Sequence, residues 1–173
     1  MAKAIFAGGC FWCTEVIFLK LKGVNQVTSG YTGGESEYPS YEQICQGNTG
    51  HVEAVEIIFD EDVISYKTLL KIFFDTHDPT QFDGQGNDIG PQYLSRIFFV
   101  DELQKKEANK YIESIINNYQ SPIITKLMPE KPFYNAEDYH QNYYEDNSNQ
   151  PYCQLVIKPK VIKFNDVYRH LLK

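Results

Sequence analysis

Two cysteines three positions apart, Cys10 and Cys13, lie in the segment GGCFWC, where a predicted strand gives way to a predicted helix. At the start of a helix, the positive end of the helix dipole and the free backbone N–H groups favour thiolate over thiol, so we expect a lowered pKa for Cys10. The two preceding glycines permit close backbone approach. Phe11 and Trp12 add two large apolar rings, which suit a small apolar group bound beside a nucleophile.

The same cysteine pair has three other interpretations. A buried structural pair is the simplest of them. A zinc site has less support, because the chain has no second Cys-x-x-Cys and its four histidines are scattered rather than closely spaced. A dithiol site of the thioredoxin kind has the right spacing, but it leaves the acidic residues of the loops unexplained. The local pattern leaves these alternatives open.

A reactive thiol also needs an acid, and Glu53 is the candidate. It lies inside the predicted strand 51–60, on a face that carries apolar side chains. If that face is core, burial raises the pKa of Glu53 and the carboxyl group stays protonated near neutral pH; a carboxylate at an exposed strand end is the alternative. Tyr41 and Tyr93, from two polar regions that contain glycines, are candidate hydroxyl donors or, taken singly, ordinary half-buried aromatic residues.

Short strands and helices in alternation must position these residues. Periodicity and turn residues predict strands at 3–7, 24–31, 51–60 and 97–100, and helices at 11–21, 41–45, 66–74, 102–118 and 166–172. Ser40 and Ser65 are the expected N-caps of the second and third helices. The polar loop 76–94 is long enough to indicate a functional role. This order of elements predicts an α+β or α/β fold with a two-layer sheet architecture.

The chain has 173 residues, of which 16 are basic and 23 acidic, and its formal net charge is −7. This size predicts one domain, residues 1–173, with one core. The 14% of aromatic residues exclude general disorder, and the acidic balance argues against nucleic acid or an anionic membrane surface as a partner. No apolar stretch is long enough to span a membrane, and the glycine-broken N-terminus is unlike a secretory signal, so we expect a cytoplasmic protein.

Several separated motifs, in a fixed order, now add up to a family resemblance. They are Gly9–Cys13, Gly30–Gly34, Tyr41, Gly50–Glu53, Gln85–Tyr93 and Ala136–Gln141. The chain resembles the A-type peptide methionine sulfoxide reductases from about residue 6 to about residue 163. The resemblance implies a ferredoxin-like mixed sheet as the core of the two-layer α/β sandwich, with a long irregular C-terminal segment.

The resemblance also implies roles for the candidate residues. The catalytic group would be Cys10, Glu53, Tyr41, Tyr93 and Asp88, and the substrate-binding group Phe11 and Trp12. The nucleophile would attack the sulfur of methionine-S-sulfoxide, in a protein or free, while the acid protonates the oxygen. Methionine would leave, and the thiol would become a sulfenic acid that condenses with a second thiol. Thioredoxin or a similar dithiol would reduce the disulfide, and neither cofactor nor metal would be needed.

The identity of the second thiol is the remaining choice. Cys13 is three residues from the nucleophile, at a position where many members of the family have glycine. Cys153 lies in the C-terminal part, where the family often carries a mobile resolving cysteine, but the following stretch 154–160 indicates an ordered, extended segment. Cys45 is expected in the core of its short helix. The sequence therefore favours Cys13 over Cys153.

Overall fold

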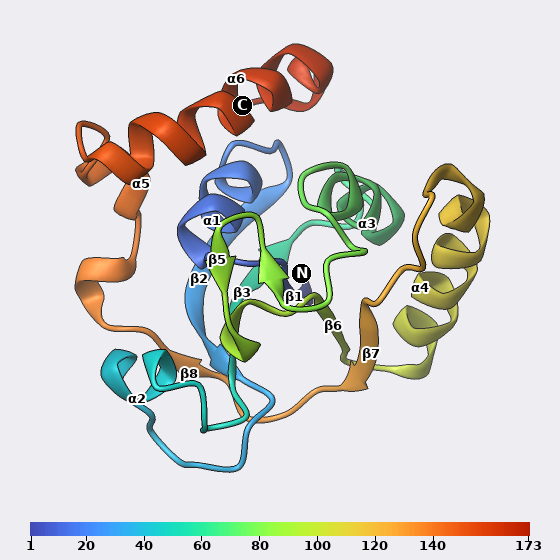
Figure 1. The fold of residues 1–173 in the computed structure, drawn as a ribbon. Helices are drawn as coiled ribbons and strands as arrows, with labels where there is room; N and C mark the ends of the chain where they lie inside the picture. The colour runs from blue at the N-terminus through green and yellow to red at the C-terminus, as the bar shows by residue number, and fades with distance from the viewer.

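A six-stranded mixed sheet forms the centre of the computed structural model, which describes residues 1–173 (Figure 1). Its strands, in the spatial order β7-β6-β1-β3-β2-β8, are β7 (Lys126–Pro129), β6 (Arg96–Phe99), β1 (Ala2–Ala7), β3 (Val52–Phe59), β2 (Val24–Thr32) and β8 (Tyr134–Asn135). Only β6 and β7 are parallel. The predicted α+β class and mixed sheet are confirmed, as are the four predicted strands.

Six α-helices and a small hairpin complete the fold. They are α1 (Phe11–Leu19), α2 (Tyr41–Cys45), α3 (Tyr66–Asp75), α4 (Glu102–Ile115), α5 (Tyr143–Asp146) and α6 (Lys158–Val167), with the hairpin β4 (Gly84–Gln85) and β5 (Asp88–Ile89). Both predicted N-caps are confirmed: Ser40 accepts a hydrogen bond from the N–H of Gln43, and Ser65 from that of Thr68. The hairpin lies inside the long polar loop 76–94.

The alternation of β3 decides which side chains lie under the helices. Val55 pairs with Phe6 of β1, and both belong to the large core that α1, α3 and α6 complete. Val52 and Ala54 belong to a second, small core on the other face of the sheet. Since side chains alternate along a strand, Glu53 shares the face of Val55 and lies below the start of α1.

The C-terminal part differs most from expectation. The stretch 154–160 is not extended: a π-helical turn, Cys153–Ile157, runs directly into α6. The physical reason is a helical stripe of buried apolar residues at Ile157, Val161 and Phe164. Pro159 does not interrupt the helix: it is the second residue of α6, directly after the π-helical turn, where the hydrogen-bond pattern changes. The helix predicted at 166–172 is wrong in its bounds. Residues 166 and 167 are the last two of α6, which ends at Val167, and only a short 3-10 turn follows.

The end of the chain is fixed against α1. Leu172 forms a bridge with Leu21, and the N–H of Lys22 donates to the carbonyl of Leu171 at 2.8 Å. Helix α6 packs on α1 and lies above it in the ribbon (Figure 1). No helix is long and apolar enough to cross a membrane.

Candidate active site

The Cys10 thiol lies at the start of α1, where Cys10 is the N-cap and only 8% exposed. Gly9 just before it has a φ of +97°, and a Cβ there would come within 2.7 Å of the Gln85 side chain. A glycine is needed at this position both for its backbone angle and for the close approach of β4. The predicted close approach beside the sulfur is confirmed.

The expectation of a lowered pKa for Cys10 is wrong. Burial raises its pKa well above the ordinary value, and the neighbouring Cys13 and Glu53 add to the rise. The pKa of Cys13 is lowered, first by a hydrogen bond with the Cys10 thiol and further by the positive charge of Lys160. A helix N-terminus stabilises an exposed anion by only about 0.3–1 kcal/mol, so burial outweighs it here. In the substrate-free protein Cys10 therefore holds its proton more tightly than Cys13.

Glu53 is buried beside this thiol, with 2% of its surface exposed. Its Oε1 accepts a hydrogen bond from the N–H of Phe11 at 3.3 Å, so the carboxyl group lies at the first turn of α1. Burial raises the pKa of Glu53 to about 8, and the negative charge of Asp88 contributes. The predicted buried acid, protonated near neutral pH, is confirmed, and the alternative of an exposed carboxylate is wrong.

Tyr41 and Tyr93 face the same acid from two other elements. Tyr41 begins α2, and Tyr93 ends the short 3-10 helix Pro91–Tyr93. Burial is the largest cause that raises the pKa of each hydroxyl, and the charge of Glu53 raises both further. The two tyrosines therefore remain hydrogen-bond donors at any pH at which the protein works.

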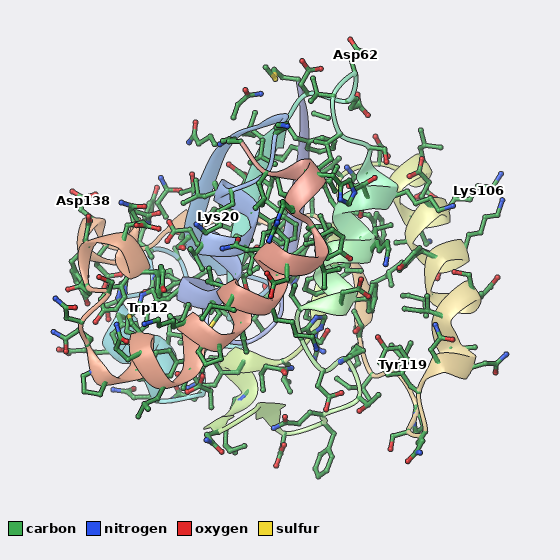
Figure 2. The ribbon with its side chains drawn as sticks, turned by 90° about the horizontal axis from the view of Figure 1, so that it is seen from above. Trp12, Lys20, Asp62, Lys106, Tyr119 and Asp138 are labelled. Atoms are coloured by element: carbon green, nitrogen blue, oxygen red, sulfur yellow. The ribbon has the colours of Figure 1, made fainter.

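Trp12 is enclosed by aromatic side chains from the C-terminal segment. Its indole N–H donates to Nδ1 of His140 at 3.0 Å, and its ring stacks on Tyr143 with centroids 3.7 Å apart and planes within 7°. The ring of Tyr152 meets it edge-on at 5.7 Å. Phe11 is a core residue with 1% exposure. In Figure 2, the C-terminal segment passes beside Trp12. Tyr143 and Tyr152 of this segment contact the indole, one on its face and one edge-on.

Asp88 connects the hairpin to the C-terminal segment. Its Oδ2 accepts a hydrogen bond from the Tyr152 hydroxyl at 2.6 Å, and the same hydroxyl is 3.9 Å from the sulfur of Cys13. A cavity of about 290 Å³ opens at this point; it is lined by Cys10, Cys13, Gln85, Gly86, Asn87, Asp88, Tyr152, Leu155, Val156 and Lys160. Of the predicted site residues, Cys10, Cys13 and Asp88 line this cavity, and Glu53, Tyr41, Tyr93, Phe11, Trp12 and Cys153 are not in its lining. Glu53 reaches the site at the first turn of α1, through the N–H of Phe11.

Four residues of the site had no assigned role in the sequence: His140, Glu137, Tyr143 and Tyr152. Glu137 accepts from the Tyr31 hydroxyl at 3.0 Å and from the backbone N–H of Tyr41 at 3.2 Å, and so fixes α2 against β2. The motif Ala136–Gln141 was a sufficient signal for Glu137 and His140. For Tyr152 the signal was its place directly before a candidate resolving cysteine.

The other two cysteines are placed differently from each other. Cys45 is exposed, so its expected core position is wrong: α2 has only five residues and buries one side chain, Ile44. Cys153 is fully buried, and burial raises its pKa. No three His, Cys, Asp or Glu side chains are grouped as metal ligands, so the zinc alternative has no ligand set.

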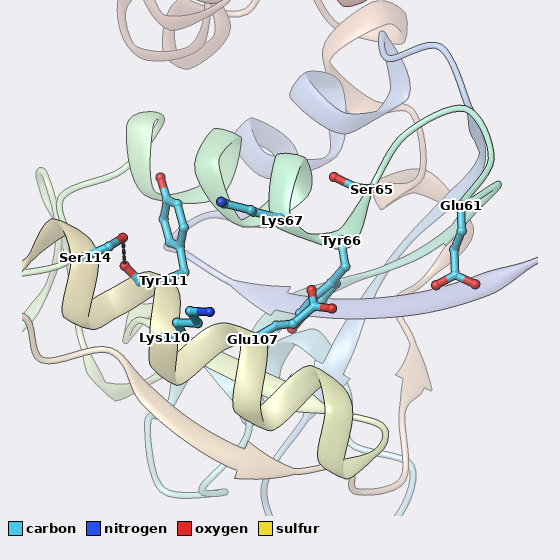
Figure 3. A pocket seen from close by; sticks show the side chains of 8 residues that line it. All are labelled: Glu61, Ser65, Tyr66, Lys67, Glu107, Lys110, Tyr111 and Ser114. Atoms are coloured by element: carbon cyan, nitrogen blue, oxygen red, sulfur yellow. Dashed lines mark hydrogen bonds between the residues drawn. The ribbon is translucent and has the colours of Figure 1, made fainter.

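Two larger cavities lie elsewhere. One of about 540 Å³ between α3 and α4 is lined by Glu61, Ser65, Tyr66, Lys67, Glu107, Lys110, Tyr111 and Ser114 (Figure 3). It shares no residue with the thiol cavity and contains no cysteine. The other, of about 650 Å³, lies between the end of α3 and α6 and includes His77 and Lys160. Chemistry rather than size therefore identifies the thiol cavity as the candidate active site.

Comparison with known proteins identifies the family to which this chain belongs. A family model described as peptide methionine sulfoxide reductase matches residues 2–171. The chain belongs to the peptide methionine sulfoxide reductase family. The peptide methionine sulfoxide reductase MsrA of Acinetobacter baumannii is 51% identical over 173 residues, covering 100% of this chain and 99% of that protein.

Solved structures agree with this family membership. Mxr1 from Saccharomyces cerevisiae in reduced form has a TM-score of 0.83 and 33% identity, with 88% of each chain covered. Methionine sulfoxide reductase A of Corynebacterium diphtheriae has a TM-score of 0.80 and 32% identity, with 84% of this chain and 74% of that one covered. This reductase is therefore an oxidoreductase that reduces methionine sulfoxide, as the resemblance implied.

Proposed function

We propose that the single domain of this reductase acts in the cytoplasm on the S-epimer of methionine sulfoxide, in proteins and free, with Cys10 as the nucleophile. The observation that carries the proposal is the neutral, buried Glu53 beside the Cys10 thiol. A sulfoxide oxygen leaves sulfur readily only after it gains a proton. A carboxyl group with a pKa of about 8 holds that proton at neutral pH.

In the proposed step, the Cys10 thiol loses its proton and its sulfur supplies an electron pair to the sulfoxide sulfur, while Glu53 protonates the oxygen and then takes up the proton that the thiol released. The bond between methionine sulfur and oxygen breaks, and the oxygen ends on Cys10 as a sulfenic acid. The substrate gains two electrons and leaves as methionine, and the cysteine loses the same two. Tyr41 and Tyr93, whose hydroxyls stay protonated, stabilise the developing charge on the oxygen.

The methyl group of the substrate is proposed to bind against Trp12, with Phe11 as the buried wall behind it. Because Tyr143 covers the indole at 3.7 Å, binding at this ring requires Tyr143 to move. Asp88 holds the Tyr152 hydroxyl at 2.6 Å and so fixes the C-terminal wall of the cavity around the reacting atoms. This wall excludes water from the thiol.

Cys13 is the proposed resolving cysteine. It lies in the first turn of α1, where its N–H donates to the carbonyl of Cys10 at 3.1 Å, and its pKa is lowered by the Cys10 thiol. Cys153 is 0% exposed and has a raised pKa, so it is the poorer nucleophile. The Cys10–Cys13 disulfide would then be opened by thioredoxin or a similar dithiol; the yeast relative Mxr1 has been solved in complex with Trx2.

The proposal is tested by reduction of each methionine sulfoxide epimer with dithiothreitol as reductant. We expect turnover of the S-epimer only, complete loss in Cys10→Ser, and full activity in the control Cys45→Ser, whose thiol is at the surface. Activity that survives in Cys10→Ser would refute the nucleophile. Reduction of insulin disulfides that needs Cys10 and Cys13 but not Glu53 would indicate a general dithiol oxidoreductase instead.

A further inference from the structure

Lys160 occupies a position in α6 that normally takes an apolar residue. The stripe that faces the core consists of Ile157, Val161 and Phe164, and Lys160 follows Ile157 by three residues on the same side. The residue is half-buried, whereas Lys163, one turn further along, is exposed. The sequence thus places a cation against α1, where it loses part of its hydration.

No partner compensates this partly buried charge. The ion pairs of the structure join Lys3, Lys71, Lys131 and Arg169 to carboxylates, and none includes Lys160. No hydrogen bond uses its ammonium group either. The ammonium group of Lys160 is therefore not neutralised by a paired carboxylate and can act on a neighbouring group through its charge.

Lys160 faces Cys13 across the packing of α6 on α1. Both residues line the thiol cavity of about 290 Å³. Both also line a second, much smaller hollow together with Ile17 of α1 and His77. Lys160 extends further into the 650 Å³ cavity, which Cys13 does not reach. Lys160 therefore lies between Cys13 and the larger cavity beside α6.

The remaining groups around Cys13 do not supply positive charge. They are the Cys10 thiol on α1, the Asp88 carboxylate on β5, the Tyr152 hydroxyl and Cys153 thiol before α6, Glu53 on β3 and His77 after α3. Burial lowers the pKa of His77 to about 4, so the ring is neutral. Asp88 opposes a thiolate at Cys13, and Lys160 is the one cation that favours it.

We propose that Lys160 is a positioning residue for the second half of the reaction, in which its ammonium group holds Cys13 as a thiolate for attack on the Cys10 sulfenic acid. This inference rests on the proposed roles of Cys10 and Cys13. The thiolate forms the sulfur–sulfur bond, the sulfur–oxygen bond of the sulfenic acid breaks, and hydroxide takes a proton and leaves as water. The Cys13 sulfur supplies the electron pair of the new bond and the oxygen leaves with the pair of the old one, so the two sulfurs end at the same oxidation level in the disulfide.

The test is the lifetime of the sulfenic acid after one turnover, followed by trapping with a cyclic diketone over a range of pH. The variants are Lys160→Met, Lys160→Arg and the control Lys163→Met on the same helix. Well below its pKa, the fraction of Cys13 present as thiolate falls tenfold for each unit by which that pKa rises. A more basic thiolate is also intrinsically more nucleophilic, with a Brønsted coefficient of about 0.5, which offsets about half of that loss on a logarithmic scale. Below the pKa of Cys13, resolution in Lys160→Met should therefore slow about threefold for each unit by which that pKa rises.

The pH profile separates this role from a structural one. In Lys160→Met the midpoint of the plot of resolution rate against pH should move to higher pH. At pH values above the midpoints of both proteins, the variant should resolve the sulfenic acid as fast as the wild type or faster. Lys160→Arg should restore the wild-type profile, and Lys163→Met should not change it. The first step, release of methionine, is measured in the same experiment and should be unchanged in the control Lys163→Met. Loss of the unpaired charge of Lys160 should leave the melting temperature unchanged or higher. Lys160→Gln provides a second neutral variant.

An unchanged pH profile in both Lys160→Met and Lys160→Gln would overturn the proposal. A Lys160→Arg variant that behaves like Lys160→Met would also overturn it, since charge would then not be the cause. Failure of the underlying mechanism gives a different result: Cys13→Ser would form a disulfide as fast as the wild type, whatever stands at position 160.

Discussion

The substitution Glu53→Gln tests the buried acid through stability as well as activity. Glutamine has the same shape, and its Oε1 accepts the N–H of Phe11 as the carboxyl group does at 3.3 Å. Folding raises the pKa of Glu53 from the ordinary 4.5 to about 8. Between these two values the folded chain keeps a proton that the unfolded chain releases, so this residue lowers the free energy of unfolding as pH rises.

The magnitude follows from that shift. Each pH unit between 4.5 and 8 costs the wild type about 1.4 kcal/mol of unfolding free energy, and the neutral amide escapes this cost. From pH 5 to pH 7, the difference between Glu53→Gln and wild type should therefore grow by about 3 kcal/mol in favour of the variant. Burial also raises the pKa of Glu15, to about 7. Glu15 is present in both proteins, so its effect on the unfolding free energy cancels in the difference between them.

Urea unfolding at the two pH values, with reductant present, measures this difference. Activity should move in the opposite direction: the amide cannot transfer a proton, and loss of a general acid lowers kcat by about a hundredfold or more. The wild-type rate should also decline as pH rises through about 8, because Glu53 then loses its proton. A stability difference that is the same at pH 5 and pH 7 would show that Glu53 is not neutral in the folded protein, and would refute the reasoning.

Four further substitutions test the surroundings of the thiol. Gly9→Ala places a Cβ at a backbone φ of +97° and should lower the free energy of unfolding by about 1–3 kcal/mol in the same urea assay. Tyr41→Phe and Tyr93→Phe should each reduce kcat about ten- to a hundredfold without loss of stability, and unchanged kinetics in both would exclude them as oxygen ligands. Tyr152→Phe removes the 2.6 Å hydrogen bond to Asp88 and should speed alkylation of Cys10 by iodoacetamide; an unchanged rate would mean that this bond does not close the cavity.

Local pattern was enough to predict the elements that carry the site. The strand 51–60 alternates clearly, so its register placed Glu53 on one face with Val55 and Ile57, and the structure shows that this face is core. The helix after Cys10 follows from its apolar spacing and from the glycines before it. The N-caps Ser40 and Ser65 are recognisable because the side chain itself makes the hydrogen bond.

The pKa of Cys10 was not predictable in this way, because it depends on burial, and the C-terminal segment that lines the cavity beside this thiol lies about 140 residues further along the chain. Long-range packing of this kind leaves no local pattern. The stretch 154–160 was predicted to be extended, whereas the buried residues Ile157, Val161 and Phe164 have a helical spacing that continues past Pro159. Cys45 was misplaced because a five-residue helix buries too little to show a periodicity.

The central claim is that Cys10 takes the oxygen from the substrate. Its most direct test is one turnover of Cys13→Ser with methionine-S-sulfoxide, followed by trapping of sulfenic acid and peptide mass spectrometry. The account predicts one methionine released per chain and the trapped sulfenic acid on Cys10. Methionine released while Cys10 remains a free thiol would contradict it.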